Sequence, residues 1–82
     1  MPRVDERVRA AVAVGENTPV IVVCGDNCAS VAKAMRDMSL SVNEGAIEMG
    51  SLFVVVGANE LRAIEAMDGI DSIELDEEVS TL

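Results

Sequence analysis

The sequence is poor in the residues that most often build catalytic sites. It contains no histidine, tyrosine or tryptophan, and Phe53 is its single aromatic residue. Without histidine, the hydroxyl side chains and the two cysteines have no imidazole to act as a general base. No Ser–Lys or paired-carboxylate arrangement stands out in its place. The sequence therefore predicts a protein that is not an enzyme and has no cofactor.

Basic residues are also scarce. The chain has 6 Lys and Arg against 15 Asp and Glu, a net charge of −9, and Lys33 is its only lysine. A surface of this sign repels phosphate backbones and anionic lipids, so we expect neither nucleic acid nor a membrane as partner. Acid-rich, lysine-poor composition resembles that of proteins from salt-loving microbes. The sequence thus predicts a halophilic protein, with an ordinary acidic protein as the alternative.

Long apolar runs are missing as well. No segment approaches the run of about 20 apolar residues that a membrane span needs. The first 19 residues carry acids and lack the apolar stretch of a secretory signal. From these two features we expect a cytoplasmic location.

What the sequence does contain indicates one small globular domain, because half of its 82 residues are apolar. Residues 1–18 are predicted to be an N-terminal leader. In it, Val4, Val8 and Val12 have helical spacing, and "GENTP" then interrupts the pattern. The leader is expected to form a short helix or to be disordered. Residues 19–82 are expected to form the folded domain.

The domain shows a repeated pattern of strands and helices. Strands are predicted over residues 19–24, 42–49, 52–56 and 71–79, with helices over residues 28–38 and 59–67. Gly50 and Ser51 suit a two-residue hairpin turn between the second and third strands. This order predicts an α+β, ferredoxin-like βαββαβ sandwich, in which two helices cover one face of a four-stranded antiparallel sheet. The two richest apolar runs should form its central strands.

One feature of these central strands does not fit an isolated domain. "VIVVC" and "LFVVV" are apolar at every position, whereas a sheet with one wet face should alternate. The uncovered face should then carry an apolar patch, and such patches usually mark partner surfaces. Self-association and cover from the leader are the alternatives.

The two cysteines, Cys24 and Cys28, lie where the first strand leads into the first helix. They distantly resemble the CxxC site of heavy-metal-associated domains, but the spacing here is CxxxC. We therefore favour two small buried hydrophobic residues, and we keep the pair as a weak candidate for binding a soft metal. The helix start lowers the expected pKa of Cys28, which leaves a redox role open.

The second half of the chain carries a resemblance to a known family. "GSLFVVVG" followed by "ELRAIEAMDGIDSIELDEEV" resembles the propeptides of subtilisin-like proteases and the fungal standalone inhibitors related to them. Leu61, Ile64, Ile73 and Asp76 fall in step with that pattern, and the first strand is similar too, so the resemblance covers about residues 19–82. The chain departs from the family in having no signal peptide, no attached protease and no aromatic residue in the second-strand region.

The resemblance implies a mode of action. The open sheet face would pack on two helices of the protease, and the acids Glu74 and Asp76 would cap the N-termini of those helices. The C-terminal tail would enter the active-site cleft as an added strand, with Leu82 and Val79 as apolar anchors and Ser80 and Thr81 as spacers. The chain would act as a propeptide-like inhibitor or as a folding chaperone.

Two other functions stay open at this point. One is a small regulatory or dimerisation module of the same fold, which pairs with a second copy through the sheet. The other is a soft-metal-binding domain that uses Cys24 and Cys28.

Overall fold

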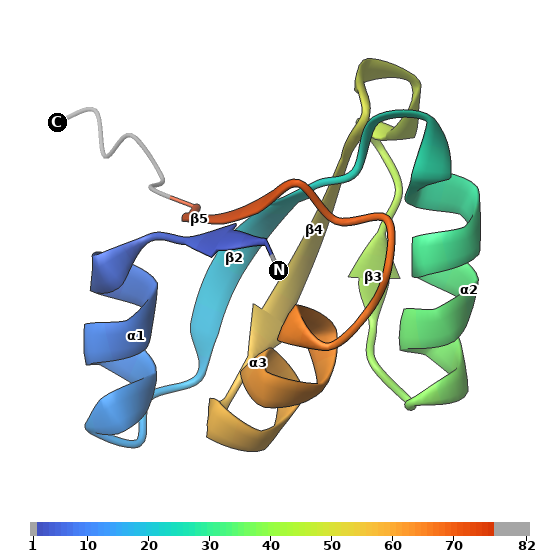
Figure 1. Ribbon diagram of the computed structural model, residues 1–82. Coiled ribbons are helices and arrows are strands. Elements are labelled where there is room, and N and C mark those ends of the chain that lie inside the picture. The colour runs from blue at the N-terminus through green and yellow to red at the C-terminus, as the bar shows by residue number, and fades with distance from the viewer. Residues whose placement is uncertain (1, 77–82) are drawn as a thin grey trace, which may run out of the picture.

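The computed structural model describes residues 2–76 of the chain (Figure 1). Along the chain, the elements are β1 (Arg3–Val4), α1 (Glu6–Ala13), β2 (Thr18–Val23), the 3-10 turn η1 (Gly25–Asn27), α2 (Cys28–Asp37), β3 (Val42–Asn43), the 3-10 turn η2 (Ile47–Met49), β4 (Ser51–Val56), α3 (Ala58–Glu65) and β5 (Ser72–Leu75). The α+β class that the sequence predicts is confirmed.

In the described part of the chain, the sheet has five strands in the order β1-β5-β2-β4-β3. The pairs β2–β4, β2–β5 and β3–β4 are antiparallel, and β1 runs parallel to β5. The sheet is therefore mixed, which corrects the predicted four-stranded antiparallel sheet. The extra strand comes from residues 1–18: the Arg3 amide donates to the Asp71 carbonyl oxygen at 3.2 Å, and the Asp5 amide donates to that of Ile73 at 2.9 Å. β2 and β4 lie inside the sheet, as predicted, but β5 is not at its edge.

All three helices within residues 2–76 contribute to one hydrophobic core. Its buried members are Val8 and Val12 from α1, Cys28, Val31, Ala32 and Met35 from α2, Leu61 and Ile64 from α3, alternate residues of the strands, and Cys24 and Ile70 from the connections. Val8 is completely buried, so the segment before β2 is an integral part of the core. It does not cover the opposite sheet face.

Helix α1 is capped by Asp5, whose carboxylate accepts a hydrogen bond from the Arg7 amide at 2.9 Å. The Arg7 guanidinium also bonds this carboxylate, with 2.8 Å between Nη2 and Oδ2. These hydrogen bonds lower the pKa of the Asp5 carboxyl group to about 2. The negative charge at the start of the helix also interacts favourably with the helix dipole.

The segment before β4 differs from its prediction. Instead of a strand over residues 42–49, the chain forms the two-residue β3 and then turns, because the Asn43 side-chain oxygen accepts a hydrogen bond from the Gly45 amide at 2.8 Å. The 3-10 turn η2 follows, and Gly50 closes it with a φ of 82°. The predicted two-residue hairpin at Gly50 and Ser51 is therefore wrong.

Over residues 2–76, the helices are all too short or too polar to cross a bilayer.

Candidate docking face

The two central strands each present one side to the core and one side away from it. In β2, Val20 and Val22 are completely buried, while Ile21 and Val23, which alternate with them, remain partly exposed. In β4, the buried residues are Leu52, Val54 and Val56, and these alternate with Phe53 and Val55. We call the outward set the open face; it consists of Pro19, Ile21, Val23, Phe53 and Val55.

The open face is continuous across the two strands. Pro19 lies opposite Val55 and Ile21 lies opposite Phe53 in the antiparallel register, and such directly opposite side chains are in reach of each other. Val55 remains 54% exposed, although valine side chains are usually buried. Pro19, Phe53 and Val55 also line a shallow hollow of about 220 Å³. The apolar patch expected from the non-alternating strands is therefore present.

Polar residues border the open face on both sides. Ile21 pairs with Glu74 on β5, and Phe53 pairs with Asn43 on β3. Glu74 is exposed and accepts a hydrogen bond from the Ser72 hydroxyl at 3.1 Å. An apolar patch with a polar rim is typical of a protein–protein interface.

The acids Glu74 and Asp76, singled out from the sequence, flank this same face. Glu74 lies beside Ile21 in the sheet register. Asp76 lies just past β5, where its amide donates to the Pro19 carbonyl oxygen at 3.1 Å, and it lines the hollow over Pro19 and Val55. The two carboxylates thus border the open face on the side of β5. The predicted tail, Val79, Ser80, Thr81 and Leu82, lies outside the described residues.

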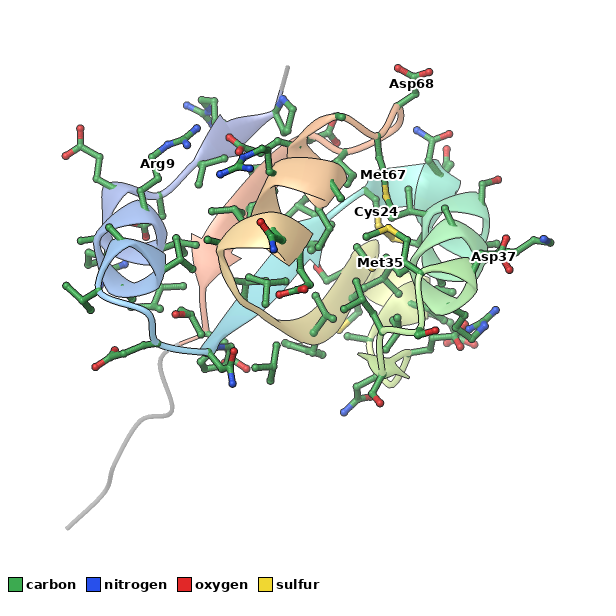
Figure 2. All side chains as sticks on the ribbon, turned by 90° about the horizontal axis from the view of Figure 1, so that it is seen from below. Arg9, Cys24, Met35, Asp37, Met67 and Asp68 are labelled. Atoms are coloured by element: carbon green, nitrogen blue, oxygen red, sulfur yellow. A yellow bond between two sulfur atoms is a disulfide. The ribbon has the colours of Figure 1, made fainter. Side chains whose placement is uncertain are left out.

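The two cysteines form a disulfide between the end of β2 and the start of α2, with 5.1 Å between the Cα atoms of Cys24 and Cys28 (Figure 2). Both are buried, as the sequence predicts, but they are not independent apolar residues. In this state neither sulfur is a free thiolate, so neither can ligate a soft metal. The sequence pattern did not predict the bridge, although a strand end and a helix start joined by three residues place two side chains close together.

The candidate site is a surface built from the apolar side chains of the open face and the two acids beside it. Among the described residues, no three His, Cys, Asp or Glu side chains are grouped to hold a metal ion. Comparisons with protein-family models, with curated proteins and with solved structures found no match.

Proposed function

We propose that the chain is a non-catalytic, propeptide-like inhibitor or folding chaperone of a subtilisin-like serine protease. The observation that carries the proposal is the open face together with the two acids at its β5 side. In the order β5-β2-β4-β3, each strand is antiparallel to its neighbours, and β2 and β4 lie in the middle. This order supports the ferredoxin-like fold that the resemblance implies, and we include that fold, over residues 19–82, in the proposal.

The open face is suited to packing against helices of the protease. Its five apolar side chains would leave water on docking, at roughly 25 cal/mol per Å² of apolar surface buried. Glu74 and Asp76 stand where the N-termini of two partner helices would approach. Each carboxylate would then contribute about 0.3–1 kcal/mol through the positive end of a helix dipole. In the proposed complex, the open face supplies most of the binding free energy, and the two acids determine how the chain is oriented on the protease.

The backbone at Asp76 lies beside the open face, because the Asp76 amide still bonds the Pro19 carbonyl oxygen. Six more residues come after Asp76 in the sequence, and six extended residues span at most about 22 Å. In the proposed complex these residues reach the active-site cleft, pair there as an added strand and place Leu82 in the primary specificity pocket. Inhibition is then product-like and needs no chemistry from this chain.

An inhibition assay with two matched variants tests the proposal. Val55→Asp places a charge in the open face, whereas Val14→Asp makes the same change at the end of α1, where Val14 is 75% exposed. Against a panel of subtilisin-like proteases in molar KCl, we expect the wild type and Val14→Asp to inhibit equally. Val55→Asp should raise the inhibition constant more than about tenfold, because an unpaired carboxylate buried in the interface costs more than about 1.4 kcal/mol. Equal inhibition by both variants, or none by the wild type, would contradict the proposal.

The second candidate function is a regulatory module that pairs with itself through the same face. The exposed apolar strip supports it as well, because two copies would bury the strip against each other. Sedimentation analysis separates the two functions. A self-pairing module is a dimer that Val55→Asp converts to a monomer, and a protease inhibitor stays monomeric at micromolar concentration.

A further inference from the structure

The disulfide lies where three loops meet: the connection from β2 to α2, the end of η2 before β4, and the connection from α3 to β5. The Cys24 and Gly25 amides both donate to the Gly50 carbonyl oxygen, at 2.9 and 3.1 Å. Gly25 and Gly50 approach so closely that a Cβ on Gly50 would lie 3.0 Å from the Gly25 Cα atom. From the third loop, the Gly69 carbonyl oxygen lies 3.5 Å from the Asn27 side-chain nitrogen, which donates to it. The backbone around the disulfide is therefore held by contacts that do not depend on the S–S bond.

The bridge itself adds little restraint to the chain. It spans a sequence separation of only four positions, and the stabilisation from a disulfide falls as the loop that it closes becomes shorter. The Asn27 amide also closes the same turn by donating to the Cys24 carbonyl oxygen at 2.9 Å. Two reduced cysteines suit the same buried positions, because free cysteine is among the most buried residue types. Reduction should consequently leave the fold in place.

The two sulfurs are not equivalent. Cys28 borders a pocket of about 440 Å³ between the start of α2 and the η2 turn, and Cys24 is not among the residues that line it. Cys28 is also the first residue of the ten-residue helix α2, where the helix dipole favours a thiolate. Both cysteines are at most 2% exposed, so an attacking thiol needs a small local opening beside this pocket.

The charges around the junction are negative. Asp26 and Glu48 line the pocket. On the other side of the loop, the Asp71 Oδ2 atom lies 4.0 Å from where a Cβ on Gly25 would be. These carboxylates repel an anionic thiol as it approaches, and the repulsion falls with added salt.

We propose that Cys24–Cys28 is a reversible thiol–disulfide exchange site, which reacts at Cys28 through this pocket and favours uncharged or cationic thiols over anionic ones. In the first step, a reductant thiolate attacks the Cys28 sulfur, and Cys24 leaves as a thiolate and takes up a proton. A dithiol reductant then completes the reaction. Its second thiolate attacks the reductant sulfur that is bonded to Cys28, so the reductant closes its own disulfide. Cys28 leaves as a thiolate and is protonated. The chain gains two electrons and two protons, and the dithiol becomes a disulfide. The helix N-terminus assists the second step, in which Cys28 leaves as a thiolate. In the first step, where Cys24 leaves, access through the pocket beside Cys28 determines which sulfur is attacked.

The first experiment asks whether reduction needs global unfolding. Reduction by dithiothreitol is followed by alkylation and mass spectrometry over a series of low urea concentrations. We expect a rate that hardly changes with urea, because the opening exposes little surface, and an unchanged circular dichroism spectrum after reduction. A rate that rises with urea as steeply as the global unfolding equilibrium, or a reduced chain that unfolds, would overturn the proposal.

The second experiment locates the attack and tests the charge preference. A pulse of 2-mercaptoethanol followed by iodoacetamide should leave the thiol adduct on Cys28 and the alkyl group on Cys24; the opposite labelling would overturn the assignment. Rates for cysteamine, 2-mercaptoethanol and 2-mercaptoethanesulfonate, corrected for thiolate fraction, should fall several-fold in that order at low salt and converge in molar KCl. An unchanged or reversed order would refute the preference.

A pair of variants tests whether the pocket acids cause the preference. Asp26→Asn with Glu48→Gln should narrow the spread of rates among the three thiols. Asp37→Asn removes a charge from the other end of α2, where Asp37 is exposed on the outer side of the helix (Figure 2) and pairs with Lys33. This control should leave the spread unchanged. Equal narrowing in both cases would show that net charge alone, and not the pocket, sets the order.

Discussion

Two neighbouring valines on β2 provide a direct test of which sheet face is buried. Val22 is completely buried against the helices, whereas Val23 lies on the open face. Changing either residue to alanine removes the same two carbons and the same strand preference, so the difference between the two variants reports burial alone.

The expected magnitudes differ clearly. At Val22, two buried carbons contribute about 1.6 kcal/mol of transfer free energy, and the cavity left behind brings the loss to about 2–3 kcal/mol. At Val23 the side chain already contacts water, so the loss should stay below about 1 kcal/mol. A loss of this size at Val22 is a large part of the total stability of a small domain.

Urea unfolding followed by far-ultraviolet circular dichroism measures both variants, since a chain without tryptophan or tyrosine has no useful intrinsic fluorescence. With a slope of about 1 kcal/mol per molar urea, Val22→Ala should lower the midpoint by about 2–3 M and Val23→Ala by less than about 1 M. Equal shifts would show that the assignment of the two faces is wrong, and with it the basis for the docking face.

Three further measurements test other parts of the structure. Deleting residues 80–82 should weaken protease inhibition most, and Leu82→Asp should weaken it somewhat less. Glu74→Gln with Asp76→Asn should cost only about 1 kcal/mol of binding, and circular dichroism should be unchanged in each variant. A truncated chain that inhibits like the wild type would contradict the proposed role of the tail. Because the folded-state pKa of Asp5 is about 2, below its ordinary value of 3.8, its contribution to stability should be present above about pH 4 and lost as the pH falls towards about 2. Asp5→Asn removes the charge but keeps a good helix cap. The difference in melting temperature between wild type and variant should therefore disappear as the pH falls over that range. A difference that stays constant with pH would show that the ion pair does not cause it. Molar KCl should raise the melting temperature, because it shortens the Debye length from about 10 Å at 0.1 M to about 3 Å and screens a net charge of −9; a fall would argue against halophilic adaptation.

Much of the secondary structure follows from local sequence alone. The β-branched runs around Val22 and Val54 determine the two central strands, which the structure places at residues 18–23 and 51–56. The apolar stripe of Cys28, Val31 and Met35 determines α2 and the face that it buries. These signals are strong because each depends on side chains within a few residues of one another.

Long-range contacts decided the rest. A strand that is apolar at every position has no alternation to show which side faces the core, so the packing of the helices determined that Val22 points inward and Val23 outward. The pairing of β1 with β5 joins residues far apart in the sequence, Arg3 with Ser72 and Val4 with Ile73, and only two residues of each strand take part. Two residues of strand carry too weak a local pattern to be recognised from the sequence.

The candidate site divides in the same way. The continuous apolar runs in the sequence predicted an apolar surface on the sheet, and the family resemblance implied that Glu74 and Asp76 would act beside it. Only the tertiary structure decided that Glu74 and Asp76 lie on the same face as Ile21 and Val55, and that Cys24 and Cys28 meet in a disulfide. The physical reason is that strand register brings residues of different strands together, and the closed turn between β2 and α2 brings the two sulfurs within bonding distance. Neither depends on local residue preference.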